Sequence, residues 1–166
     1  MIKLILFLIT VAVVVLDQFT KQFVTRTMQI GDSNPIIDNF LYMAYHRNSG
    51  AAWGILQGQM LFFYVVTAVA VIGILIWLSK LNLKKERVLA IALALILGGA
   101  LGNFIDRVMH QAVIDFIQTV WWGYHFPIFN VADIALVCGV MLMMLDILIL
   151  DRKSNKELYF KMDTPK

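Results

Sequence analysis

The sequence of 166 residues is short of charge and nearly free of cysteine. Charged side chains make up 15% of it and apolar ones 60%, and the mean hydropathy is +0.77. A soluble domain of this size usually has about 25% charged and about 45–50% apolar residues. Cys138 is the one cysteine, which excludes a disulfide framework or a C-x-x-C metal site within one chain. The composition therefore predicts one compact integral membrane domain.

Four apolar runs are long enough to cross a bilayer, which takes about 20 mostly apolar residues in a helix. They cover residues 2–24, 60–78, 88–106 and 131–150. The first run is not followed by an A-x-A cleavage site, so we interpret it as a retained helix rather than a signal peptide.

Residues 25–59 separate the first two runs and hold Gly, Pro and Asn turn signals together with alternating stretches such as FLYMAYH. This pattern favours a small cap outside the membrane that contains β-strands. We expect an all-α membrane protein of four transmembrane helices with that cap. Residues 1–152 form its single domain, and residues 153–166 form a basic tail.

The basic residues are distributed unevenly between the two sides of the predicted membrane domain. Ten lie on the side of both termini and four on the other side. Because Lys and Arg favour the cytoplasmic side, both termini are predicted to be cytoplasmic and the cap extracytoplasmic. The net charge of +3 is then explained by topology, and nucleic-acid binding is not expected.

Acidic and amide side chains gather near the predicted extracytoplasmic boundary, where they are costly and commonly functional. Each also has a structural interpretation. Asp17 and Lys21 are four residues apart on one helix face and can pair, and Asp106 and Arg107 form a second pair. Asp133 with Asn130 fits a helix N-cap, and Asp115 fits an interfacial acid. Asp146 is expected at the opposite interface.

Two carboxyl groups held close together cannot both ionise easily, so one keeps a proton while the other acts as a base. Such a pair can activate water with one member and protonate a carbonyl or a leaving amine with the other. Asp115 and Asp133 are the candidates, and the chemistry is peptide hydrolysis without a covalent intermediate.

Other interpretations use the same residues differently. Ser49 with Lys21 would form a serine nucleophile, and His46, His110 and His125 with an acid would form a zinc site. Cys138 lies in an apolar run and is expected in the core. A small transporter or proton relay would use the same acids. A non-catalytic assembly subunit would rely on the G-x-x-x-G spacing of residues 98–102.

Five motifs occur in order between the four runs: DQFTK (17–21), HRNSGAAWG (46–54), GGALGNFIDR (98–107), VIDF (113–116) and FNVAD (129–133). Together they resemble the lipoprotein signal peptidase family, also called signal peptidase II. The resemblance covers about residues 2–150.

The resemblance implies a bacterial plasma-membrane aspartic endopeptidase that needs no metal or cofactor. Its substrates are prolipoproteins with a diacylglyceryl group on a cysteine, and it cuts just before that cysteine. We expect a monomer in contact with membrane lipid, and the predicted topology places its site near the extracytoplasmic face. The family's catalytic pair corresponds to Asp115 and Asp133. Substrate binding or site support is implied for Asn48, Gly50, Asn103, Arg107 and Asn130, and structural support for Asp17, Lys21 and Asp106.

Overall fold

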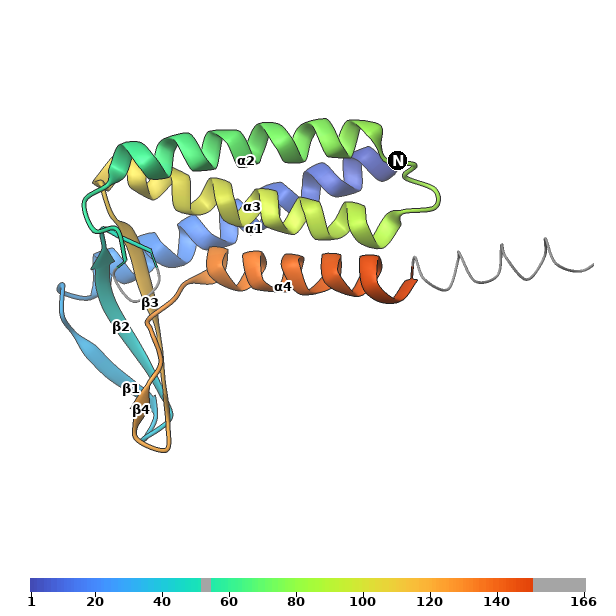
Figure 1. Ribbon diagram of the computed structural model, residues 1–166. Helices are drawn as coiled ribbons and strands as arrows, with labels where there is room; N and C mark the ends of the chain where they lie inside the picture. Colours follow the sequence, from blue (N-terminus) through green and yellow to red (C-terminus); the bar gives the residue numbers. More distant parts are fainter. Residues whose placement is uncertain (52–54, 151–166) are drawn as a thin grey trace, which may run out of the picture.

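A computed structural model of the chain describes residues 1–51 and 55–150. Four long helices lie side by side, with a small sheet at one end of the bundle and the N-terminus at the other (Figure 1). All four are long and apolar enough to cross a membrane, which confirms the predicted fold class. Residues 52–54 of the predicted cap and the predicted tail 153–166 lie outside the described residues.

Two of the four helices extend beyond the predicted apolar runs at the sheet end. The four helices are α1 (Ile2–Thr27), α2 (Met60–Lys80), α3 (Arg87–His110) and α4 (Val131–Leu145), the last continued by the π-helical segment Asp146–Leu150. α1 and α3 run a few residues past the predicted ends at 24 and 106. Their last turns are held by contacts with the sheet and with α2, which hydropathy alone does not register.

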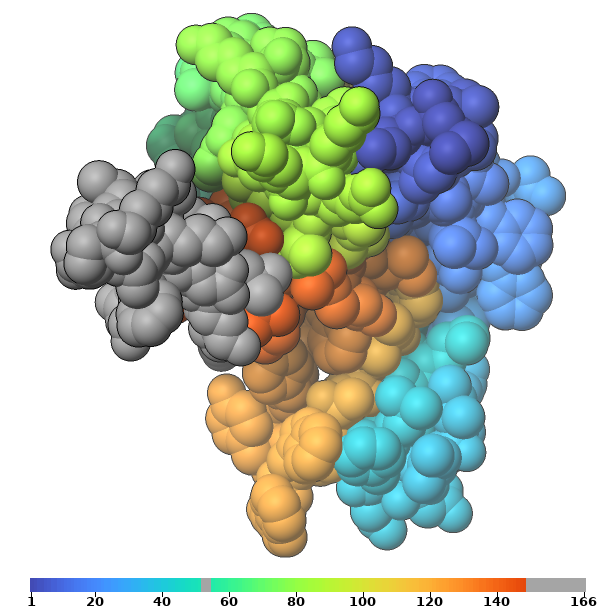
Figure 2. Space-filling model, turned by 90° about the vertical axis from the view of Figure 1, so that its right-hand side faces the viewer, coloured from blue at the N-terminus to red at the C-terminus, as the bar shows by residue number. Residues whose placement is uncertain are grey.

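The sheet has four antiparallel strands in the order β1 (Ser33–Ile37), β2 (Leu41–Asn48), β3 (Val113–Trp121) and β4 (Tyr124–His125). The first two come from the predicted cap. The other two come from the segment between α3 and α4, for which no strands were predicted. The strands run across the direction of the helices (Figure 1). Viewed along the helices from the opposite end, the sheet reaches past their outline (Figure 2).

An apolar cluster attaches the sheet to the bundle. Val24 at the end of α1 packs with Tyr45 of β2 and with Ile114 and Phe116 of β3, and all four are buried. Burying side chains of this size contributes about 1.5–3 kcal/mol each. The cluster fixes where β3 crosses the end of the bundle, and therefore where Asp115 lies.

Helix α3 is the centre of the bundle, because 56% of its apolar stretch is buried, compared with 6% for α2. Its glycines allow the neighbouring helices to approach closely. A Cβ atom on Gly98 would lie 2.7 Å from Cβ of Val13 in α1, and one on Gly102 would lie 2.6 Å from the Asp17 carboxylate. The G-x-x-x-G spacing therefore marks helix packing, as predicted.

Candidate active site

Asp115 and Asp133 come from different elements at the sheet end of the bundle. Asp115 lies in β3, where it is the register partner of His46 in β2, and its side chain is only 2% exposed. Asp133 lies in the first turn of α4 and is half-buried. Seventeen intervening residues fold back as the β3–β4 hairpin and bring the two acids to one cavity.

The start of α4 is a capping box. The Asn130 side-chain oxygen accepts from the Asp133 backbone N–H at 2.9 Å, and the Asp133 carboxylate accepts from the Asn130 backbone N–H at 3.2 Å. Two backbone donors that a helix start leaves without partners are satisfied in this way. The N-cap interpretation of this pair is confirmed.

Asn130 also links the two acids. Its side-chain nitrogen donates to Asp115 Oδ1 at 2.7 Å, and the whole side chain is buried. Its oxygen is committed to the Asp133 backbone, so only the nitrogen is available to face Asp115. One residue therefore holds both candidate acids, one through each half of its amide.

Two further asparagines complete the contacts of the carboxylates. Asn103 donates to Asp133 Oδ1 at 2.8 Å. Asn48 donates to Asp115 Oδ2 at 3.1 Å, while its own oxygen accepts from the Gly50 backbone N–H at 2.9 Å. All four oxygens of the two acids thus accept at least one hydrogen bond, and both carboxyl groups are fixed in orientation.

Burial changes the acidity of Asp115. The pKa of its carboxyl is raised from the ordinary value of 3.8 to about 7. Loss of hydration is the main cause, and the negative charge of Asp133 adds to it. The hydrogen bonds from Asn48 and Asn130 act in the opposite direction. Asp115 is therefore able to hold a proton close to neutral pH.

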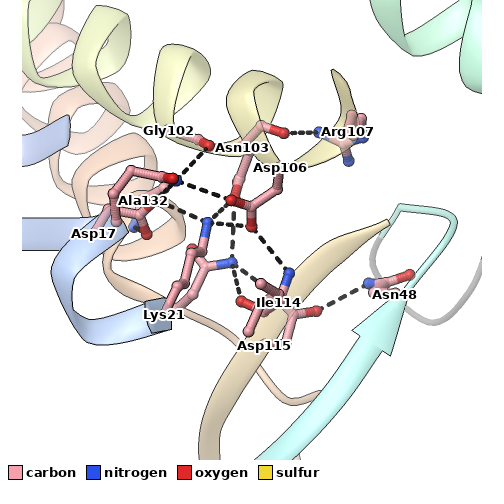
Figure 3. A network of polar contacts seen from close by, with 12 residues as sticks. Asp17, Lys21, Asn48, Gly102, Asn103, Asp106, Arg107, Ile114, Asp115 and Ala132 are labelled. Atoms are coloured by element: carbon pink, nitrogen blue, oxygen red, sulfur yellow. Dashed lines mark hydrogen bonds and ion pairs between the residues drawn. The ribbon is translucent and has the colours of Figure 1, made fainter. Parts of the chain in front are cut away.

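Behind the two acids lies a buried charge cluster, drawn in Figure 3. Lys21 pairs with Asp17 at 2.8 Å and with Asp106 at 2.9 Å, and none of the three is more than 1% exposed. The predicted Asp17–Lys21 pair is present, but the predicted Asp106–Arg107 pair was wrong. Adjacent residues of a helix point in different directions, so Asp106 turns toward α1 while Arg107 turns toward the cavity.

Asp17 and Asp106 also bind backbone at the edges of the site. Asp17 accepts from the Ala132 N–H at 2.9 Å, and Asp106 accepts from the Ile114 N–H at 3.0 Å. Each of these backbone groups immediately precedes one of the two candidate acids in the chain. The charge cluster therefore sets the positions of both Asp115 and Asp133.

Arg107 and Gly50 meet at the rim. The Arg107 guanidinium donates to the Gly50 carbonyl at 3.3 Å and lies over the Phe63 ring, 4.5 Å from its centre. Phe63 is the one buried side chain of α2. This contact with an aromatic face suits a cation at a partly dry site. It joins α2 to the segment that follows β2.

The two acids face a cavity of about 820 Å³. Polar groups line one part of it and apolar side chains of α4 line another. Its residues include His46, Asn48, Ser49, Asn103, Arg107, Asp115, Phe126, Phe129, Asp133, Ile134, Leu136, Val137 and Cys138. Cys138 is exposed to this cavity, so its predicted core position was wrong. Hydropathy cannot tell which face of an apolar helix meets a neighbour.

The other sequence interpretations fit the geometry less well. Lys21 is occupied by Asp17, Asp106 and Asn103 rather than by Ser49. In residues 1–51 and 55–150, no three His, Cys, Asp or Glu side chains are grouped closely enough to hold a metal ion. The ionisable residues of α3 are Arg87 at its start and Asp106, Arg107 and His110 in its last turns, with none in the apolar stretch between them. A proton relay would require such groups along the depth of the bundle.

Two contributors were missed in the sequence. Gln18 donates to Asp106 at 2.8 Å and to the Gly102 carbonyl at 3.2 Å, so it joins α1 to α3. Phe63 supports Arg107. The polar Gln18 next to Asp17 in an apolar run was an available signal, whereas nothing distinguished Phe63 from the lipid-facing Phe62.

Comparison with known proteins identifies the family of the chain. A family model described as signal peptidase (SPase) II matches residues 9–149. A protein of Listeria welshimeri named lipoprotein signal peptidase is 55% identical over 149 residues, covering 90% of this chain and 96% of the relative. Proteins of the same name from Bacillus pumilus and Halalkalibacterium halodurans are 53% and 50% identical, covering 91% and 93% of this chain and 96% and 98% of each relative.

Two solved structures share the fold. Both are described as bacterial membrane enzymes determined by the in meso method, at 2.3 Å and 1.9 Å resolution. They superimpose with TM-scores of 0.82 and 0.79, and each is 46% identical in sequence. The first match covers 91% of this chain and 90% of the other, and the second covers 87% and 92%.

Proposed function

Because this chain belongs to the signal peptidase II family, we propose that it is an aspartic endopeptidase that removes the signal peptide from prolipoproteins. The cut falls just before a cysteine that carries a diacylglyceryl group. The observation that carries the catalytic type is the pair of carboxyl groups linked by Asn130 at the wall of the cavity.

The two acids have different environments and therefore different roles. Asp115 is buried, with its pKa raised to about 7, and it is the acid that holds the shared proton. Asp133 lies in the first turn of α4, and its two oxygens accept hydrogen bonds from Asn103 and from the Asn130 backbone, so it is held as an acceptor beside the cavity. Asp133 is therefore the base that activates water.

The proton movements follow from these roles. Asp133 takes a proton from water as the water oxygen attacks the scissile carbonyl carbon, and Asp115 gives its proton to the carbonyl oxygen. In the second step the C–N bond breaks. Asp133 returns its proton to the leaving nitrogen, and Asp115 regains a proton from one hydroxyl of the tetrahedral intermediate. Both acids end in their starting states, so the cycle needs no metal or cofactor.

The substrate lies where polar and apolar walls meet. Asn48, Gly50 and Arg107 line the polar rim and bind the peptide backbone near the cut. Ile134 and Val137 of α4 face the same cavity and are exposed, so acyl chains can lie along them within the bilayer. The lipid on the cysteine then fixes the depth of the scissile bond at the level of the acids.

The orientation follows from the distribution of basic residues. Both termini lie in the cytoplasm, and the sheet and the cavity lie at the extracytoplasmic face of the bacterial plasma membrane. Residues 1–152 form one peptidase domain that acts as a monomer, and 153–166 form a cytoplasmic tail. A lipid-modified cysteine emerging from the membrane is presented at that same face.

The test is direct. Purified protein in lipid nanodiscs is incubated with a diacylglyceryl-modified prolipoprotein, and the new N-terminus is identified by mass spectrometry. We expect a product that starts with the lipid-modified cysteine, and a much slower reaction with the same precursor lacking the lipid. A cut elsewhere, or equal rates for both precursors, would contradict the proposed specificity.

A further inference from the structure

Lys21 is the least exposed basic side chain at the site, and all three of its ammonium hydrogens have a partner. Two go to Asp17 and Asp106 in the ion pairs described above. The third goes to the side-chain oxygen of Asn103, at 3.0 Å. A lysine ammonium has three donors and no acceptor, so its capacity is filled.

This third contact determines which way round the Asn103 amide lies. Because Lys21 can only donate, the atom that faces it must be the amide oxygen. The amide nitrogen then points the other way and donates to Asp133 Oδ1 at 2.8 Å. If the amide turned over, its nitrogen would face the ammonium and its oxygen would face the carboxylate, and both contacts would be lost.

The other two asparagines are oriented differently. The Asn130 oxygen accepts from the Asp133 backbone N–H, and the Asn48 oxygen accepts from the Gly50 backbone N–H. Each of these two amides is therefore oriented by a backbone group two or three residues away in the chain. Asn130 also donates to the Asn103 oxygen, at 3.2 Å, and so favours the same Asn103 orientation through a longer hydrogen bond from an uncharged donor. Only Asn103 depends on a charged side chain from another helix.

We infer that Lys21 is a positioning residue for hydrolysis: it holds the Asn103 amide in the one orientation that donates a hydrogen bond to the base, Asp133. This inference rests on the proposed function, because it assigns the contact to the catalytic base. It goes beyond structural support, in which Lys21 would do no more than hold α1 against α3. Replacing a buried ion pair by apolar side chains is often neutral for stability, so the two roles are separable.

The key variant changes two residues of the cluster, which holds two acids and one lysine, so that its net charge stays the same. Lys21→Met with Asp106→Asn removes one positive and one negative charge, so the net charge of the cluster is unchanged. Asp106→Asn alone is its reference, since an amide oxygen can still accept from Lys21 and from the Ile114 N–H. A hydrogen bond to a charged group is worth enough to change a rate by about 10- to 100-fold.

We therefore expect Lys21→Met to lower kcat by about 10- to 100-fold in the Asp106→Asn background. KM should change by less than about twofold, because Lys21 does not line the cavity. Rates are normalised to the fraction of folded, monodisperse protein in each preparation, which separates lost chemistry from lost protein.

A double-mutant cycle with Asn103→Ala then separates positioning from structural support. Once the amide is gone, Lys21 has nothing to orient, so adding Lys21→Met should lower kcat by less than about threefold. An equal loss of kcat with and without Asn103 would overturn the inference and leave Lys21 as structural. So would unchanged kcat in a folded Lys21→Met/Asp106→Asn variant.

Failure of the Lys21 inference can be distinguished from failure of the proposed peptidase function. If the parent protein does not cleave the lipid-modified precursor, the proposed function fails before the cycle begins. If the parent cleaves it and Asp133→Asn does not, the dyad stands and the cycle tests Lys21 alone. If Lys21→Met/Asp106→Asn does not fold while Asp106→Asn does, Lys21 is required for folding and the positioning role is rejected.

Discussion

The side-chain nitrogen of Asn130 lies 2.7 Å from the Asp115 carboxylate, the shortest contact that either candidate acid makes with another side chain. The same residue caps the helix that carries the other acid. The start of α4 and the relative positions of the two acids therefore depend on the same Asn130 amide.

Substitution of Asn130 should separate these two tasks. A serine hydroxyl caps a helix about as well as asparagine but has no nitrogen to donate to Asp115, whereas alanine loses both functions at a cost of about 1 kcal/mol for the cap. We expect Asn130→Ser to melt at nearly the parent temperature but to lose most of the cleavage rate. Asn130→Ala should lose most of the cleavage rate and should also melt at a lower temperature. Equal rates for Asn130→Ser and the parent would show that the bridge to Asp115 is not needed.

The two acids should each be indispensable. Asp115→Asn and Asp133→Asn are expected to lower the cleavage rate by about 10²–10⁴-fold, because neither acid nor base has a substitute nearby. Asp38→Asn is the matched control, since Asp38 is an exposed acid in the β1–β2 turn. Ser49→Ala, which removes a hydroxyl lining the same cavity, should keep full activity. Either dyad variant retaining more than about a tenth of the rate would refute the assignment.

The pH dependence of the rate should reflect the raised pKa of Asp115. The proposed acid must carry its proton, so activity should decline as the pH rises through about 7, and a second decline on the acidic side should follow protonation of the base. The profile is bell-shaped, and its two apparent values belong to the coupled pair.

Infrared spectroscopy can locate that shared proton. A protonated carboxyl band should disappear as the pH rises through about 7 and be absent in Asp115→Asn. In Asp133→Asn it should disappear at lower pH, because the neighbouring negative charge that raises the Asp115 pKa is gone. A band that survives in Asp115→Asn but not in Asp133→Asn would exchange the roles of the two acids.

Cys138 provides a chemical probe of the cavity. It is exposed and shares the cavity wall with Asp133, so alkylation should place a bulky group where the substrate lies. We expect N-ethylmaleimide to inhibit the parent protein, and Cys138→Ala to be active and insensitive to the reagent. Full activity of a protein shown by mass spectrometry to carry the adduct would place the substrate elsewhere.

The sequence predicted those parts of the fold that depend mainly on one property, such as the hydropathy of a segment. Hydropathy and length located the four helices, because a spanning segment must bury its backbone polar groups in an apolar helix whatever its neighbours are. The alternation of FLYMAYH predicted strands in the cap and corresponds to β2, while the bounds of β1 were not predicted. β3 was missed because Val113–Trp121 is buried on both faces over its first half and lacks a clear period of two.

The sequence predicted which residues belong to the candidate site but not which contacts they make with one another. Asp115, Asp133, Asn103 and Asn130 were noted as polar residues near the membrane boundary, whereas Asn48 was named only through the resemblance to the family. The partner of Asp106, the exposure of Cys138 and the orientation of Asn103 depend on how α1, α3 and α4 are rotated about their axes. That rotation is set by the glycine contacts between helices, which spacing indicates but does not specify.

The unequal burial of the helices constrains how this chain can change over evolutionary time. α2 buries a single side chain, Phe63, so its leucines, isoleucines and valines can replace one another as long as the helix stays apolar. α3 has no such freedom, because its small residues are in contact with α1 and α4 and its polar end reaches the acids. Neutral drift should therefore accumulate in α2, while substitutions in α3 should survive only when a facing residue changes with them.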